Sequence, residues 1–149
     1  MLTDLARVRP FEDLSAADLT LIEPYFYSSM HAAGDVLFSQ DEPADKLYIV
    51  MDGDIAVRYK PYDAPEITVT HLHKGDVLGW STALGNSSYT SSAVCTTDVS
   101  VLQITGANLR NLITKHPQTG TMVMDRLATA VSPRWKDTQR QVRSLLRAQ

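Results

Sequence analysis

The stretch from Lys74 to Val94 decides the fold of this chain, and it reads Lys-Gly-Asp-Val-Leu-Gly-Trp-Ser-Thr-Ala-Leu-Gly-Asn-Ser-Ser-Tyr-Thr-Ser-Ser-Ala-Val. A Gly-Asp turn is followed by two strand residues, Gly79 ends this strand, and residues 80–84 can form one helical turn. Residues 89–94 then return as a strand. The first N–H groups of such a turn have no intrahelical partner and point outward. The layout therefore predicts a cradle for an anion or another small ligand.

Gly-Asp pairs recur on both sides of this stretch. They occupy positions 34–35, 53–54 and 75–76, and their starts lie 19 and 22 residues apart. Glycine supplies the positive φ that tight turns need, and Asp tolerates turns. Strand-like segments lie between and after the turns, at 46–51, 55–59, 67–72 and 99–104, and Pro61, Asp63 and Pro65 mark a hairpin tip. This spacing predicts a roll of antiparallel strands over residues 27–105.

Helical patterns flank the predicted roll. Ser15 is followed three residues later by Asp18, which is typical of a helix N-terminus within the region 10–26. This helix should end near Glu23, because Pro24 disfavours the helical conformation of the residue before it. C-terminal helices are expected over 107–149, the first ending before Pro117 and a longer one beginning near Thr119.

The longer helix carries an apolar seam. Its members step by three or four residues and are Met124, Leu127, Val131, Trp135, Thr138, Val142 and Leu145. Such spacing fits an amphipathic helix packed on its own domain, and it equally fits a coiled-coil-like homodimer. A homodimer would use Leu127, Val131, Trp135, Val142 and Leu145. Pro133 lies inside the seam and predicts a kink or a break.

Composition narrows the class of protein. A chain of 149 residues is long enough for one domain with its own core, and we expect a single domain over 1–149. The single cysteine, Cys95, excludes an internal disulfide and is expected to be a buried strand residue. The N-terminal residues do not resemble a signal peptide, and no apolar run is long enough to span a membrane. We therefore expect a cytoplasmic protein.

Charge is unevenly distributed along the chain. Residues 134–149 hold five of the 14 basic residues and one acid, whereas residues 1–133 carry a net charge of −7. An acidic body with a short basic tail does not favour nucleic-acid binding, which needs clustered basic residues. The tail could instead contact an acidic partner or the acidic body itself.

Catalytic and metal-binding patterns are weak. His71 and His73 would share one face of a strand, as in cupin metal sites, but no Glu lies within 75–80 to complete the set. We therefore expect no metal and no cofactor. The serines and threonines of residues 81–97 lack a nucleophile elbow, and no phosphate-binding loop or dinucleotide fingerprint is present. An enzyme is not expected.

The order of a helix, a roll with an embedded cassette and two further helices resembles the cyclic nucleotide-binding domain family, which includes bacterial catabolite activators and protein kinase A regulatory subunits. The resemblance covers about residues 10–135 and includes the turns at 34–35, 51–53 and 74–76. It implies an eight-strand antiparallel β-roll of the double-stranded jelly-roll type, mainly β with flanking α-helices, and a non-catalytic regulatory role. Family members that bind DNA carry a helix-turn-helix domain after the long helix, whereas this sequence ends at Gln149, so direct DNA binding is not expected.

The resemblance also implies which contacts a nucleotide would need. In the family a Glu after the cassette glycine holds the ribose 2′-hydroxyl, and an Arg about nine residues later meets the cyclic phosphate. Here Trp80 follows Gly79, and Tyr89 stands at the arginine position. A phenol cannot replace the charged fork of Arg, and losing such a charge-assisted bond costs about 1.5–3 kcal/mol. We therefore expect that cyclic AMP and cyclic GMP are not bound in the usual way.

Two interpretations of this degenerate cassette stay open. In the first, a cavity persists and senses a less charged or flatter ligand, for which the candidate binding residues are Gly79, Trp80, Ser81, Thr82, Tyr89, Thr90 and Ser91. In the second, Trp80 and Tyr89 fill the pocket, and the domain is a ligand-free interaction or dimerisation module. An empty pocket would favour the first interpretation, and a pocket filled by these side chains would favour the second.

Overall fold

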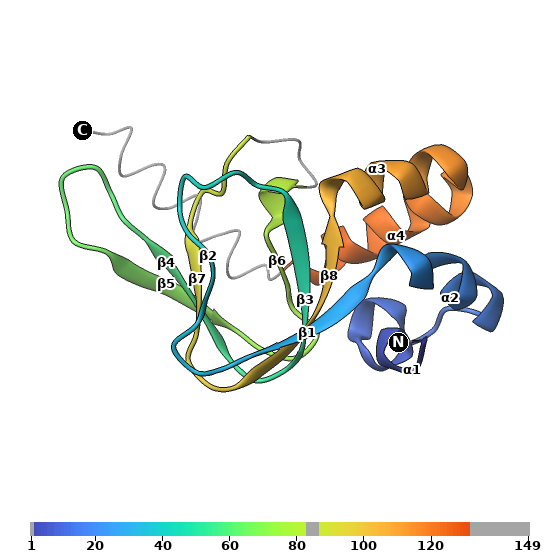
Figure 1. Ribbon diagram of the computed structural model, residues 1–149, viewed down its shortest axis with the longest axis horizontal. Coiled ribbons are helices and arrows are strands. Elements are labelled where there is room, and N and C mark those ends of the chain that lie inside the picture. Colours follow the sequence, from blue (N-terminus) through green and yellow to red (C-terminus); the bar gives the residue numbers. More distant parts are fainter. Residues whose placement is uncertain (1, 83–86, 132–149) are drawn as a thin grey trace.

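Two four-stranded antiparallel sheets form the body of the protein in the computed structural model, which describes residues 2–82 and 87–131 (Figure 1). The first sheet has the order β1-β8-β3-β6 and contains β1 (Tyr27–His31), β8 (Val99–Thr105), β3 (Lys46–Asp52) and β6 (Val77–Leu78). The second has the order β2-β7-β4-β5 and contains β2 (Val36–Phe38), β7 (Ser92–Cys95), β4 (Ile55–Tyr59) and β5 (Ile67–Leu72). The expected eight-strand roll is confirmed.

Helices gather at one end of the roll, against the first sheet (Figure 1). They are α1 (Leu2–Arg7), the 3-10 helix η1 (Arg9–Phe11), α2 (Ala16–Ile22), the 3-10 helix η2 (Glu23–Tyr25), α3 (Gly106–Lys115) and α4 (Pro117–Ala130). The predicted cap is present, because Ser15 Oγ accepts a hydrogen bond of 3.1 Å from the Asp18 N–H. The region 10–26 is broken rather than one helix, since Pro24 turns its last residues into η2. Pro117 begins α4 two residues earlier than expected, in the first turn where proline is tolerated.

Glycine turns reverse the chain where the sequence predicted them. Gly34, Gly53 and Gly75 have φ of +94°, +94° and +91°. Two features exclude a side chain at Gly53. Its backbone has a positive φ, and a Cβ would lie 2.3 Å from the Asp98 carbonyl oxygen. The repeated Gly-Asp pairs therefore mark positions at which the roll changes strand.

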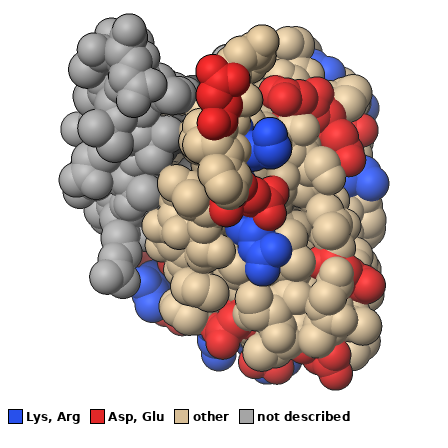
Figure 2. All heavy atoms as spheres, turned by 90° about the vertical axis from the view of Figure 1, so that its left-hand side faces the viewer, with Lys and Arg blue, Asp and Glu red and all other residues tan. Residues whose placement is uncertain are grey.

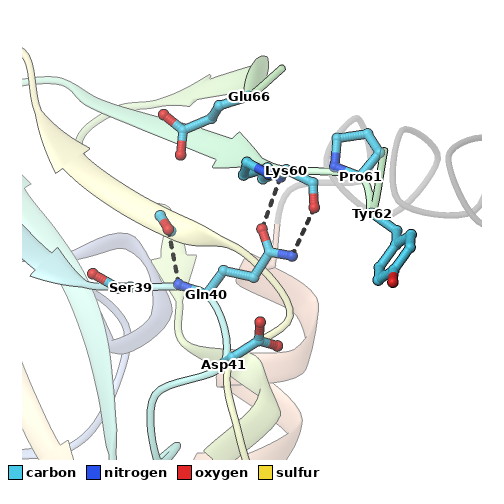
Figure 3. A pocket seen from close by; sticks show the side chains of 8 residues that line it. Ser39, Gln40, Asp41, Lys60, Pro61, Tyr62 and Glu66 are labelled. Carbon is cyan, nitrogen blue, oxygen red and sulfur yellow. Dashed lines mark hydrogen bonds between the residues drawn. The ribbon is translucent and has the colours of Figure 1, made fainter. Parts of the chain in front are cut away.

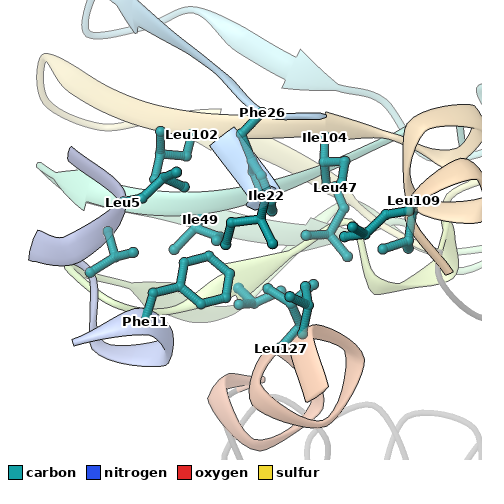
Figure 4. Packing of buried hydrophobic residues seen from close by; sticks show 14 of the residues in the cluster. Leu5, Phe11, Ile22, Phe26, Leu47, Ile49, Leu102, Ile104, Leu109 and Leu127 are labelled. Carbon is teal, nitrogen blue, oxygen red and sulfur yellow. The ribbon is translucent and has the colours of Figure 1, made fainter. Parts of the chain in front are cut away.

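Two apolar clusters hold these layers together. One lies between the helices and the first sheet and includes Phe11, Ile22, Leu47, Leu102 and Leu127, all fully buried (Figure 4). The other lies inside the roll, between the sheets, and includes Phe38, Tyr48, Leu72, Tyr89 and Cys95. Alternate residues of β3 and β8 feed different clusters, so the first sheet is covered on both faces.

The strand expected over residues 89–94 begins later, at Ser92. Residues 88 and 89 pair instead with the loop before β3. Pro43 forms an isolated bridge with Ser88, and the Tyr89 N–H donates to the Glu42 carbonyl oxygen at 2.9 Å. These backbone bonds fix where the Tyr89 side chain enters the roll.

Two of the residues proposed for a dimer seam lie within the described part of the chain. Both face the protein's own core. Leu127 is 0% and Val131 is 2% exposed, and α4 ends at Ala130, so Val131 follows the helix and forms a bridge with Val77. These two side chains are therefore unavailable to a second subunit. The remaining residues proposed for a dimer seam, Trp135, Val142 and Leu145, lie outside the described residues, as does Pro133.

Candidate functional site

The cassette runs from β6 through Gly79 into the 3-10 helix η3 (Trp80–Thr82), and it continues at Ser87. Residues 83–86 lie outside the part of the chain that the structure describes. The expected helical turn is present at residues 80–82, where the Thr82 N–H donates to the Gly79 carbonyl oxygen at 3.0 Å. The strand-glycine-turn order predicted from the sequence is therefore present up to Thr82.

Tyr89 lies inside the roll. Its side chain is 3% exposed, and its ring stacks on Phe38 with a centroid separation of 3.9 Å and an interplanar angle of 15°. It belongs to the same apolar cluster as Leu72, Leu78 and Val57. Stacked aromatic rings add about 0.5–1.5 kcal/mol to the stabilisation that their burial provides. Tyr89 is thus a packed core residue.

The buried phenol is held by the backbone of Lys46. The Tyr89 hydroxyl donates to the Lys46 carbonyl oxygen at 2.6 Å and accepts from the Lys46 N–H at 3.0 Å. The Thr82 hydroxyl donates to the same carbonyl oxygen at 3.0 Å. The first residue of β3 therefore ties the cassette turn to the Tyr89 side chain. Sequence patterns gave no sign of this role for Lys46, because its backbone makes the contacts.

Gly79 also lies close to the first residue of β3. It has φ of +78°, and a Cβ at this position would lie 2.7 Å from the Lys46 carbonyl oxygen and 3.5 Å from Tyr89 Cε1. Only glycine fits both the backbone conformation and the space. Gly79, Thr82 and Tyr89 consequently converge on one peptide group.

The other candidate residues do not gather around Tyr89 in the same way. Trp80 is half-buried and packs on the cluster beneath the helices, not on the cluster that contains Tyr89. Ser91 is 5% exposed, Thr90 is half-buried, and Ser81 contributes to η3. The two aromatic residues therefore do not fill one pocket together, because only Tyr89 of the two packs inside the roll.

Burial sets the electrostatics of this site. Removal from water raises the pKa of Tyr89 above its usual value, although the hydrogen bonds to the Lys46 backbone and to Thr82 oppose this effect. Burial also raises the pKa of Tyr48 and of the Cys95 thiol. The Tyr89 and Tyr48 hydroxyl groups are therefore neutral around neutral pH and offer no charge to a phosphate.

One basic side chain does reach this end of the roll, and it comes from α3. Arg110 Nη1 and Thr82 Cγ2 both lie 3.2 Å from the point that a Cβ of Gly106 would occupy. The guanidinium thus folds over the start of α3, beside the cassette turn. Sequence reasoning missed it because Arg110 stands 28 residues after Thr82, and only the return of β8 brings them together.

The histidines expected to form no metal site lie on the outer edge of the roll. His73 Nδ1 is hydrogen-bonded to an Asp54 carboxylate oxygen, and His71 and His73 line a shallow hollow along β5. Within residues 2–82 and 87–131, no group of three or more His, Cys, Asp or Glu side chains could hold a metal ion. The described helices also include none that is long and apolar enough to cross a membrane.

Comparison with known proteins identifies the class to which this fold and cassette belong. The sequence profile of the cyclic nucleotide-binding domain matches residues 30–116, and the chain belongs to the cyclic nucleotide-binding domain family. A CRP-like cAMP-activated global transcriptional regulator of Mycobacterium tuberculosis is 24% identical over 124 residues, which are 83% of this chain and 55% of the regulator. A relative from Rhodopseudomonas palustris is 27% identical over 113 residues, 76% of this chain and 27% of its own length. The chain thus spans about half of the first relative and about a quarter of the second.

Solved structures share the fold at lower sequence identity. A cyclic nucleotide-binding domain from Methylobacillus flagellatus has a TM-score of 0.79 and 17% identity, covering 95% of this chain and 79% of the other. The regulatory subunit of a cAMP-independent protein kinase A from Trypanosoma cruzi, bound to guanosine, has a TM-score of 0.74 and 20% identity, covering 96% and 49%. The corresponding subunit from Trypanosoma brucei, in a triple variant that introduces an arginine and is bound to cyclic AMP, has a TM-score of 0.75 and 21% identity, covering 95% and 50%.

Proposed function

We propose that this domain is a non-catalytic regulatory module whose cassette does not hold cyclic AMP or cyclic GMP in the usual way, because Tyr89 closes it. The observation that carries the proposal is the position of the Tyr89 side chain, which is 3% exposed and tied to the Lys46 backbone by two hydrogen bonds. A nucleotide placed where the family places it would have to displace this ring. Displacement would break the stack on Phe38 and remove the acceptor of the part-buried Lys46 N–H.

The charge of the site supports the same proposal. Trp80 and Tyr89 stand where the family has a glutamate and an arginine, so both charged contacts to the nucleotide are missing. Arg110 lies beside the cassette turn, but it folds over Gly106 on the helix side, whereas Tyr89 lies inside the roll. In this proposal the module acts through protein contacts, and its output partner is a separate domain or subunit.

A second candidate function is the sensing of a ligand that lacks a phosphate. It is favoured by the Trypanosoma cruzi neighbour, which was solved with guanosine, a nucleoside without a phosphate group. The hydroxyls of Thr82 and Ser91 and the ring of Trp80 could serve a neutral ligand of this kind, provided that Tyr89 swings out. The domain would then be a sensor of altered specificity.

Thermal unfolding in the presence of cyclic AMP, cyclic GMP and guanosine tests both candidates. A ligand that binds only the native state stabilises it by about 2.7 kcal/mol at 100 times its dissociation constant, which is a readily measured shift. We expect no shift with either cyclic nucleotide. A shift with guanosine alone would support the second candidate, and a shift with cyclic AMP would contradict the proposal.

A double variant, Trp80→Glu with Tyr89→Arg, provides the positive control. It restores both charged groups that the family uses and removes the ring from the roll. If the variant retains the circular dichroism spectrum of the parent, we expect it to gain a thermal shift with cyclic AMP. The Trypanosoma brucei variant, which carries an introduced arginine and binds cyclic AMP, motivates this design.

A further inference from the structure

Each of the two sheets ends in two edge strands, whose outward backbone N–H and C=O groups are not used in the sheet. Among the described residues these edges are β1 and β6 in the first sheet, and β2 and β5 in the second. An open edge accepts a further strand, and proteins prevent this with short strands, bulges, charged side chains or proline. The four edges of this roll differ in how well they are protected.

Backbone geometry protects three of the edges. β6 has two residues, and Val77 within it already forms a bridge with Val131. β2 has three residues, and its register with β7 shifts between Val36 and Phe38. The register between β4 and β5 shifts as well. Such irregularities bend a strand and interrupt the row of backbone groups that a new strand would need.

Side chains give the second sheet further protection. The Gln40 side chain fastens the loop after β2 to the β4–β5 hairpin, since it donates to the Lys60 carbonyl oxygen at 3.0 Å and accepts from the Lys60 N–H at 2.8 Å (Figure 3). Glu66, just before β5, forms an ion pair of 3.7 Å with Arg58. The face that carries the hairpin displays both acidic and basic side chains among the described residues (Figure 2). A strand that approached the second sheet would therefore meet a bonded loop and charged groups.

β1 has none of these protective features. It pairs with β8 in unbroken register, from Tyr27 opposite Gln103 to His31 opposite Val99. Its sequence, Tyr-Ser-Ser-Met-His, contains no proline and no Asp, Glu, Lys or Arg. Met30 is 84% and Tyr27 is 39% exposed, so the strand is open to solvent. Within residues 2–82 and 87–131, β1 is therefore the regular and uncharged edge of the roll.

Hydrogen bonds on one face of β1 hold the strand in place. Gln103 Nε2, from β8, donates to Ser29 Oγ, and Ser29 Oγ lies 2.9 Å from His31 Nε2. Ser28 and Met30 point to the other face, because side chains alternate along a strand, and both are exposed. The edge is thus ordered before a partner arrives, which lowers the entropic cost of association.

The sequence of β1 is complementary to itself. A two-fold axis through Ser29 sets all residues of one β1 opposite those of a second β1 in antiparallel order. Tyr27 then lies opposite His31 of the second copy, Ser28 opposite Met30, and Ser29 opposite Ser29. The members of each pair share a face, as the pleat requires, and none of the pairs brings together like charges, which would destabilise a sheet. A charged partner strand would find no opposite charge on β1, whereas an identical strand needs none.

We propose that β1 pairs with β1 of a second copy of this chain, antiparallel and in the register centred on Ser29. The two first sheets then form one continuous sheet, with the β6 edges and the cassettes at its far ends. This interface does not rest on the proposed function of the cassette. It also differs from the dimer seam, whose residues Leu127 and Val131 are buried in the protein's own core. A single pair of short strands buries little surface, so the association is weak.

Sedimentation equilibrium of the full chain over a range of protein concentrations tests the association. We expect the apparent mass to rise with concentration from that of the monomer toward that of the dimer. Two-dimensional NMR of the ¹⁵N-labelled protein over the same range locates the contact, and the backbone amides of residues 28–31 should shift with concentration. A mass that stays at the monomer value, or shifts that leave β1 unaffected, would overturn the proposal.

A pair of double variants tests the register. Ser28→Lys with Met30→Lys sets lysine opposite lysine at both symmetric positions, and it should weaken the association about three- to tenfold. Ser28→Glu with Met30→Lys sets opposite charges at the same positions, and it should associate at least as tightly as the parent. Both positions are exposed, so both variants should keep the circular dichroism spectrum of the parent.

The comparison separates strand pairing from other causes of association. Residues 1–133 carry a net charge of −7, so added lysines reduce the overall repulsion between two copies, and a loss of association is then due to the paired strands. Association through residues 134–149 would respond to neither variant. Equal dissociation constants for the two double variants would refute the β1 register.

Discussion

At the scale of single residues, the hydroxyl group of Tyr89 ties its side chain to the first residue of β3. The hydroxyl both donates to and accepts from the Lys46 backbone, at 2.6 Å and 3.0 Å. The Thr82 hydroxyl donates a further hydrogen bond of 3.0 Å to the same carbonyl oxygen. Removing the acceptor of the part-buried Lys46 N–H should destabilise the protein, so this contact should be visible in the free energy of unfolding.

Tyr89→Phe is expected to destabilise the domain by about 1–3 kcal/mol, because the Lys46 N–H loses its acceptor while the ring keeps its stack on Phe38. Urea unfolding followed by circular dichroism measures the change in the free energy of unfolding. Tyr62→Phe is the matched control, since Tyr62 is 92% exposed and its hydroxyl should contribute almost nothing. Equal stabilities of Tyr89→Phe and the parent would mean that the hydroxyl does not hold the cassette.

The residue scale is also where sequence reasoning about the site was incomplete. The sequence places Trp80 and Tyr89 in the cassette, and it was compatible both with a persistent cavity and with a pocket filled by these two side chains. The partner of Tyr89 could not be predicted, because a backbone carbonyl and N–H carry no residue-specific signal.

At the scale of elements, α3 and α4 meet through a glycine. A Cβ on Gly120 would lie 2.6 Å from Ile113 Cα and 3.0 Å from Ile113 N, which are rigid backbone atoms. Glycine inside a helix normally destabilises it by about 0.5–1 kcal/mol relative to alanine. Here Gly120 allows α3 and α4 to pack closely, which offsets this local cost. The approach places Val123 and Leu127 in the core beneath the first sheet.

Gly120→Ala should therefore destabilise the protein by about 1–3 kcal/mol, opposite in sign to the usual effect of this change in a helix. The measurement is again the free energy of unfolding in urea. Thr121→Ala lies on the exposed side of the same turn and serves as the control, with an unchanged or slightly higher stability expected from helix propensity. Stabilisation by Gly120→Ala would show that α3 and α4 can separate without cost.

The boundaries of helices and strands were predicted correctly where residues close in sequence determine them. Ser15 caps α2 through Asp18, and the turn glycines adopt positive φ. The strand expected from residue 89 was wrong at its start, because residues 88 and 89 pair with the loop before β3. Partners distant in sequence decided that boundary, and periodicity cannot reveal them.

At the scale of the whole molecule, two buried phenols couple folding to alkaline pH. Burial raises the pKa of Tyr48 and of Tyr89 above the value of about 10 that tyrosine has in an unfolded chain. Below this pH both side chains are neutral in the folded and unfolded states, and their contribution to stability is fully present. Above it the unfolded state releases protons that the folded state keeps, so stability is lost as pH rises through the folded pKa.

The free energy of unfolding is expected to fall between about pH 10 and pH 11.5, by up to about 1.4 kcal/mol per pH unit for each buried tyrosine. Urea unfolding at several pH values measures the slope, and Tyr48→Phe should reduce it. Tyrosine absorbance at alkaline pH gives a second readout. Of the six tyrosines, we expect Tyr48 and Tyr89 to ionise only when the protein unfolds. Early ionisation of all six tyrosines in the folded protein would contradict the burial described here.

The amino-acid sequence by itself predicted an antiparallel roll with flanking helices, because glycine turns, caps and apolar periodicity are local physical signals, and the family resemblance added that the roll has eight strands. It also places Trp80 and Tyr89 in the cassette, and on the family resemblance we propose that they replace its charged pair. Only the tertiary structure decided where these side chains go: Trp80 packs beneath the helices, and Tyr89 lies inside the roll on Phe38 and Lys46. It likewise assigned Leu127 and Val131 to the protein's own core. The physical reason is the same in each case: an apolar or amphipathic side chain carries a preference for burial, and the choice among burial sites is made by packing and backbone partners distant in sequence.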